Sequence, residues 1–164
     1  MKDKKFLSAF FIIGLTCFLA VSGMVSLVAA SDTTENVENL TIITADGREF
    51  LFTVEIATTV EERKKGLMFR RFLAPQSGML FDYGEMRKAA MWMKNTYVPL
   101  DILFIDDTGV IVNIAHNTVP LSLIPISSDG PVLCVLEINA GTAKSLNIKA
   151  GDVVSNRIIK ETVE

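Results

Sequence analysis

The chain has 164 residues, of which 49% are hydrophobic and 21% charged, and its formal net charge is −3. A weakly acidic chain without a basic stripe is a poor candidate for nucleic-acid binding. Once the first 30 residues are set aside, 164 − 30 = 134 residues remain, which is a typical size for one domain.

The N-terminal segment, residues 1–30, has the pattern of a membrane-targeting sequence. Lys2, Lys4 and Lys5 precede an uncharged run, residues 6–30, that ends in small side chains. The run is long enough to span a bilayer, which needs roughly 20 residues, so it predicts either a cleaved signal peptide or an N-terminal membrane anchor. Both alternatives predict an exported or membrane-anchored protein with its domain outside the cytoplasm. We expect residues 31–39 to form a polar tether and residues 40–160 a single β-rich domain.

The first predicted elements are a hairpin and a short helix. Two β-rich runs, residues 40–44 and 50–56, flank Asp46-Gly47, and this dipeptide favours a tight hairpin turn. The run Thr59-Val60-Glu61-Glu62 is a capping box, which predicts that a helix begins there. Gly66 is expected to end this helix.

Most of the remaining chain alternates between apolar and polar residues with the period of two that is typical of strands. Residues 142–147 predict a second short helix, and residues 82–88 and 117–130 predict loops. The pattern predicts an all-β fold, a jelly-roll-like sandwich or closed barrel with one or two short helices. The further predicted strands are residues 78–81, 89–94, 102–105, 110–115, 132–138 and 153–159.

Several short motifs resemble those of the domain of unknown function 192 family. They are Glu62-Arg63 with Gly66-Leu67-Met68-Phe69-Arg70, Gly78-Met79-Leu80-Phe81, Trp92-Met93-Lys94-Asn95-Thr96, Pro99-Leu100-Asp101, Leu136-Glu137, Gly141 and Gly151-Asp152. The resemblance covers about residues 40 to 160. It implies a jelly-roll-like β-sandwich, often exported or anchored by one N-terminal segment, with no established activity. The chain departs from the family pattern at Met91, where an aromatic residue often stands.

Charged and polar residues next to the predicted core strands are the candidate site. Buried charges are costly unless they are paired, so these residues form either a structural network or a site for a carboxylate, a phosphate or a sugar. We expect a non-enzymatic module that binds a small polar ligand or an envelope partner, with membrane contact through the N-terminal segment and without a cofactor. The candidate ligand-binding residues are Arg63, Trp92, Lys94, Asn95, Asp101 and Glu137.

Two alternatives stay open. Asp101 and Glu137 could form the carboxylate pair of an envelope hydrolase, which requires both to face one cleft at roughly 5 to 10 Å. Alternatively, methionines and His116 could bind a soft ion such as Cu(I) or Ag(I), although methionines also fill irregular cores. Cys134 lies in an apolar run and is interpreted as a buried small hydrophobe.

Overall fold

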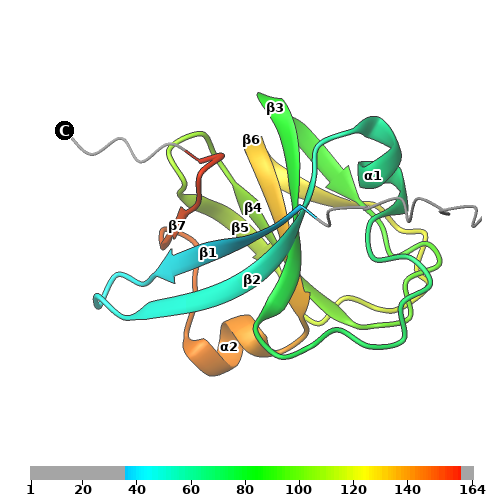
Figure 1. The fold of residues 1–164 in the computed structure, drawn as a ribbon, viewed down its shortest axis with the longest axis horizontal. Coiled ribbons are helices and arrows are strands. Elements are labelled where there is room, and N and C mark those ends of the chain that lie inside the picture. The colour runs from blue at the N-terminus through cyan, green and yellow to red at the C-terminus, as the bar shows by residue number, and fades with distance from the viewer. Residues whose placement is uncertain (1–35, 160–164) are drawn as a thin grey trace, which may run out of the picture. The chain divides into compact units, whose positions relative to one another are not determined.

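The computed structural model describes residues 36–159 of the protein, and Figure 1 draws them as a ribbon. The prediction of an all-β domain with one or two short helices is confirmed. Residues 1–30, the predicted signal peptide or anchor, lie outside the described residues. Within residues 36–159, no helix has the length and hydrophobicity needed to cross a membrane. The elements are β1 Val37–Ile43, β2 Glu49–Ala57, α1 Val60–Lys65, β3 Ser77–Met91, β4 Leu100–Ile105, β5 Ile111–Ala115, β6 Ile126–Asn139, α2 Thr142–Leu146 and β7 Val153–Ser155.

The strands form one sheet in the order β5-β4-β6-β3-β2-β1-β7. Every neighbouring pair is antiparallel except β2 and β3, which are parallel and are connected through α1. The two edge strands meet, because Val110 bridges Val153 and the Val154 N–H donates to the Gly109 carbonyl at 2.8 Å. A Cβ on Gly109 would lie 2.5 Å from the Val154 carbonyl oxygen, so only glycine allows this approach. The sheet therefore curls on itself, which matches the barrel alternative better than a two-sheet sandwich.

The curled sheet separates two hydrophobic cores. The inner core collects side chains from all seven strands and from Ala143 of α2. The outer core lies on the other face of β3, β4 and β6, where the long loops cover it. Leu80, Leu103 and Leu136 belong to the inner core, and Met79, Ile102 and Val135 to the outer core. Side chains on the outer face of β3, β4 and β6 therefore lie beneath the long loops, whereas those on the inner face do not.

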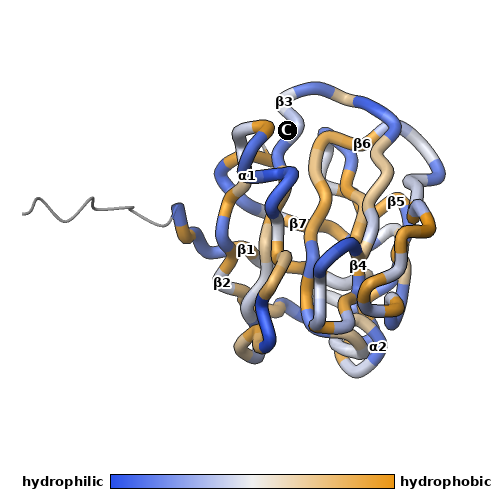
Figure 2. The backbone as a smooth tube through the Cα atoms, turned by 90° about the vertical axis from the view of Figure 1, so that its right-hand side faces the viewer, coloured by the Kyte–Doolittle hydropathy of each residue, from blue (hydrophilic) through white to orange (hydrophobic). Residues whose placement is uncertain are grey.

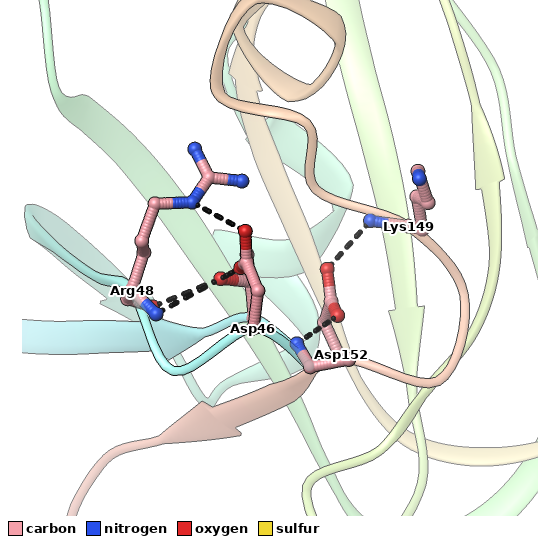
Figure 3. A network of polar contacts seen from close by, with 6 residues as sticks. Asp46, Arg48, Lys149 and Asp152 are labelled. Carbon is pink, nitrogen blue, oxygen red and sulfur yellow. Dashed lines mark hydrogen bonds and ion pairs between the residues drawn. The ribbon is translucent and has the colours of Figure 1, made fainter.

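A polar network fixes the β1–β2 turn to the turn before β7 (Figure 3). Asp152 is buried, and its carboxylate accepts hydrogen bonds from the Ala45 N–H at 2.9 Å and the Lys149 N–H at 2.7 Å. In the β1–β2 turn, Arg48 Nε donates to Asp46 at 2.9 Å. The predicted hairpin is confirmed. Because Asp152 uses its two oxygens on backbone donors, this network is structural.

Several sequence predictions on element boundaries are wrong, including the tether of residues 31–39, which overlaps β1, and the strand of residues 89–94, which ends at Met91. Residues 82–88 are not a loop but part of β3, which runs unbroken over Ser77–Met91 with register shifts against β6. Residues 84–88 are exposed, and Figure 2 shows this part of β3 as a mostly hydrophilic arc. Strands pair through backbone hydrogen bonds, which do not require apolar side chains. The alternation of apolar and polar residues therefore did not reveal this part of the strand. Residues 126–130 likewise belong to β6, and β7 ends at Ser155.

Candidate functional site

A cleft of about 390 Å³ opens on the outer face of the sheet. Its walls are the last turn of α1 with residues 66–68, the second half of β3, and the loop that follows β3. Glu137 of β6 also lines the cleft. The volume suits a small molecule, since ligand pockets of proteins measure roughly 300–1,000 Å³.

The capping box holds α1 in place at the cleft. The Thr59 hydroxyl accepts from the Glu62 N–H at 3.2 Å, and the Glu62 carboxylate accepts from the Thr59 N–H at 2.9 Å. These backbone donors lower the pKa of Glu62. Arg63 Nη1 donates to the Asp82 carbonyl at 2.7 Å and to the Thr58 carbonyl, which attaches α1 to β3. The predicted capping box and the helix end at Gly66 are confirmed.

Glu137 is placed in an apolar surrounding by the strand register. Its cross-strand neighbours are Met79 on β3 and Ile102 on β4, and both belong to the outer core. Only 4% of the residue is exposed, and this burial raises the pKa of Glu137 to about 8. A carboxyl group in such a place is protonated in most molecules at neutral pH.

The Glu137 carboxyl has no partner within residues 36–159, since no hydrogen bond or ion pair to it occurs among them. No fully enclosed side-chain oxygen or nitrogen in this part of the chain lacks a hydrogen-bond partner. The Glu137 oxygens must therefore reach the open space of the cleft that the residue lines. An unpartnered acid that lines a cleft is available to a ligand.

The rest of the cleft is basic. Four cations line it, Arg63, Lys64, Lys65 and Arg87, and Glu137 is the single acid among the described lining residues. The guanidinium groups of Arg63 and Arg87 lie 5.4 and 5.3 Å from the centre of the Tyr83 ring. Burial raises the pKa of Tyr83, so its hydroxyl stays protonated. The arrangement offers positive charge for an anion together with aromatic surface.

Three of the six candidate residues, Arg63, Trp92 and Glu137, line this cleft together. Lys94 and Asn95 belong to the adjoining loop and do not line it. The Lys94 ammonium lies 5.1 Å from the Trp92 ring centre. Asn95 adopts a φ of 55°, and its side-chain amide faces the Met68 sulfur at 3.9 Å.

Asp101 lies on the opposite face of the sheet from Glu137. In the register between β4 and β6, Asp101 pairs with Ile138, and Ile102 pairs with Glu137. Paired residues share a face and successive residues point to opposite faces, so Asp101 and Glu137 point to opposite faces of the sheet. The fully buried Asp101 carboxylate accepts from the Asn117 and Ala143 N–H groups, each at 2.9 Å, so it belongs to a structural network. The two acids cannot face one cleft, so the hydrolase alternative lacks the geometry that it requires.

The methionines do not form one cluster. Met79 and Met93 are buried in the outer core, and the Met93 sulfur accepts from the Thr118 hydroxyl at 3.2 Å. Met68 and Met91 line the cleft, while Met86 is exposed. His116 Nδ1 lies 3.9 Å from Asp101, which does not line the cleft. Within the described residues, His, Cys, Asp and Glu side chains nowhere gather in threes as a metal site would require.

Sequence reasoning missed several lining residues. Tyr83 and Arg87 were assigned to a loop, and their placement on β3 depends on a strand that alternation did not reveal. Lys64 and Lys65 lie in the last turn of α1 and are not among the six candidate residues. The sequence signal that could have found them is the run of three cations, Arg63 to Lys65, directly before Gly66. All three line the cleft.

Fold and cleft together define a small all-β domain that carries a basic cleft on the outer face of a curled sheet. The chain belongs to the DUF192 family of uncharacterised proteins, whose sequence profile matches residues 41–156.

Two solved structures are similar to it. One is a proposed transcription regulator from Sinorhizobium meliloti 1021, with 51% identity, a TM-score of 0.72, and coverage of 73% of this chain and 92% of that one. The other is a protein of unknown function from Novosphingobium aromaticivorans DSM 12444, with 42% identity, a TM-score of 0.71, and coverage of 73% and 85%. A search of curated proteins gave no match.

Proposed function

We propose that this protein is a non-enzymatic module outside the cytoplasm that binds a small organic anion in the cleft around Glu137. The observation that carries the proposal is the unpartnered Glu137 carboxyl, 4% exposed, in a cleft that four cations line. A buried ionisable group that lowers stability is a marker of function.

The chemistry of the cleft specifies what the ligand offers. The protonated Glu137 carboxyl donates one hydrogen bond, which suits a carbonyl, hydroxyl or carboxylate oxygen. Arg87 and the lysines at the end of α1 attract the negative charge of a carboxylate or a phosphate. Phe81, Met91 and Trp92 supply apolar contact for the body of the ligand. A short organic acid or a sugar acid meets all three requirements.

Binding is favoured over hydrolysis, because a carboxylate pair needs a second acid in the same cleft. Among the described lining residues Glu137 is alone. The proposed location rests on residues 1–30, whose sequence is that of a signal peptide or anchor.

The test is thermal unfolding of a chain of residues 31–164 with citrate, gluconate, inorganic phosphate and, as a neutral comparison, glucose. A ligand at a hundred times its dissociation constant adds about 2.7 kcal/mol, which is a shift of several degrees. Glu137→Leu should fold, since its neighbours are apolar, and should lose the shift. Glu137→Gln retains a hydrogen-bond donor and should lose less.

Arg87→Gln should also weaken binding of the anion, whereas Lys88→Gln, the next residue on the same strand, should not. Lys88 is exposed and does not line the cleft. If the shift survives in both Glu137→Leu and Arg87→Gln, the anion binds elsewhere and the proposal fails.

A further inference from the structure

Three loops beside the cleft expose large apolar side chains. They are residues 66–76, 92–99 and 116–125, and Figure 1 draws them together on the right-hand side of the molecule. The exposed fractions reach 73% at Phe72 and 74% at Ile124. We define the loop patch as Phe69, Phe72, Tyr97, Leu121, Leu123 and Ile124, all of which are at least 42% exposed.

Backbone hydrogen bonds tie these loops into one surface. The Phe69 N–H donates to the Asn95 carbonyl at 2.8 Å, and the Leu121 N–H donates to the Thr96 carbonyl at 3.1 Å. The Met93 N–H also donates to the Ser122 carbonyl at 3.0 Å. The central loop thus holds the other two on either side of it.

Phe69 and Leu121 are held in an unfavourable conformation. Their φ angles are 65° and 64°, in a region that bulky residues rarely adopt. The same two residues donate the hydrogen bonds to the central loop, so the strained backbone presents an exposed apolar side chain on each side. Strain of this kind persists where the surrounding structure enforces it and marks functional surfaces.

The charges of the three loops indicate which kind of surface they can bind. Residues 66–76, 92–99 and 116–125 contain no Asp or Glu, although the whole chain has a net charge of −3. Arg71 lies 5.3 Å from the Tyr97 ring centre and Lys94 lies 5.1 Å from that of Trp92, and within residues 36–159 neither forms an ion pair. Aromatic and aliphatic side chains beside unpaired cations suit an anionic lipid surface.

The start of the domain lies next to this patch. Val37 pairs with Glu55 in the β1–β2 register, and the Glu55 side chain forms an ion pair with Arg70 of the first loop. Only residues 31–35 separate Asn36 from the apolar run that ends at Ala30. If residues 1–30 stay in a membrane, the five residues of this connection reach at most roughly 20 Å, given about 3.5 Å per extended residue.

We infer that the loop patch is a peripheral membrane-binding surface, which inserts its apolar side chains into an anionic leaflet. This inference stands independently of the ligand proposed for the cleft. Figure 2, turned so that this side faces the viewer, shows hydrophobic stretches beside hydrophilic ones on that face.

The test is binding of residues 31–164 to vesicles of equal phosphatidylglycerol and phosphatidylcholine, followed by sedimentation. We expect this part of the chain to fold alone, since the match covers 92% of a solved chain that is 51% identical. Trp92 is the sole tryptophan of the chain, so its emission reports directly on the second loop and should shift to shorter wavelength. Brominated lipids should quench it.

Phe72→Ser with Ile124→Ser should reduce vesicle binding roughly tenfold or more, because burial of such side chains is lost. Leu51→Ser is the matched control, since Leu51 is 56% exposed on β2, outside the loops, and should change nothing. Arg71→Gln and Lys94→Gln should each weaken binding about fivefold on anionic vesicles and leave neutral vesicles unaffected.

Phe69→Asn with Leu121→Asn tests the strained backbone. Asparagine adopts positive φ readily, so the melting temperature should stay equal or rise while vesicle binding falls. Three results overturn the inference: no binding to anionic vesicles, binding that the apolar variants leave intact, or lipid-free self-association that the same variants abolish. The last would make the patch an interface between two copies.

Discussion

Replacing Glu137 with glutamine should stabilise the protein, by an amount that grows with pH. Glutamine has nearly the same shape and carries no charge, so it removes only the cost of ionising a buried acid. The cross-strand neighbours Met79 and Ile102 provide no hydrogen bond in either case. The difference between the two proteins therefore isolates the titration of one carboxyl.

The pKa of Glu137 gives the expected size. Its usual value is 4.5, and burial raises it to about 8. Below 4.5 the acid is protonated in both the folded and the unfolded chain, so titration contributes nothing. Between 4.5 and about 8 the unfolded chain loses the proton while the folded chain keeps it, and the folded state loses stability as the pH rises. The loss is about 3 kcal/mol near pH 7 and on the order of 5 kcal/mol above pH 8.

Urea unfolding of both proteins from about pH 4 to about pH 9 measures this difference. Near pH 7 the glutamine variant should melt roughly 10 °C higher as well. Glu85→Gln is the control, because Glu85 is an exposed acid on the same strand, β3, that borders the cleft. Its stability difference from the unsubstituted chain should not vary with pH in this way.

Two results would refute the reasoning. If the difference stays flat with pH, Glu137 is not held protonated by burial. If glutamine is less stable at neutral pH, the ionised carboxylate has a stabilising partner, and the basic side chains of the cleft must then close upon it. Either result would remove the basis for treating Glu137 as a hydrogen-bond donor to a ligand.

Other expectations concern positions around the fold. Asp101→Asn should cost about 2–3 kcal/mol in urea unfolding, while anion binding in the cleft stays unchanged. The two backbone N–H groups donate to different carboxylate oxygens, and in asparagine an NH2 donor replaces one of them. Gly66→Ala should lower stability by about 1–3 kcal/mol, because the φ of 48° is strained for alanine and a Cβ would meet the Phe81 ring at 3.1 Å. Burial raises the pKa of the fully buried Cys134 thiol to about 12, so its alkylation rate should follow global unfolding measured by hydrogen exchange. Alkylation in the folded protein, a stable Gly66→Ala variant or an unchanged Asp101→Asn variant would contradict the respective argument.

Elements with a local chemical signature were predictable from the sequence. The capping box at Thr59 and Glu62 and the hairpin around Gly47 both form as expected, because each depends on contacts between residues close in the chain. The second half of β3 was not predictable in this way. Its side chains are exposed, and the strand exists because the β6 backbone pairs with it from far along the sequence.

The candidate site was predictable only in part, for a related reason. Arg63, Trp92 and Glu137 were identified by residue type, and they do line one cleft. Which acid belongs to it depends on the register between β4 and β6, since a shift of one residue would exchange the two faces. Residue type alone does not show which of Asp101 and Glu137 lines the cleft.

The contrast between these two acids supports placing function at Glu137. Asp101 and Glu137 lie on neighbouring strands and are both buried, so each loses the hydration of its carboxyl on folding. For Asp101, hydrogen bonds from two backbone N–H groups replace the lost hydration, and they fix α2 and the loop after β5. For Glu137, no hydrogen bond within the described residues replaces the lost hydration. An apolar side chain of similar size would fit the outer core better. A structural role explains the first acid, whereas the second has no protein partner within the described residues and faces a cleft that a ligand can enter.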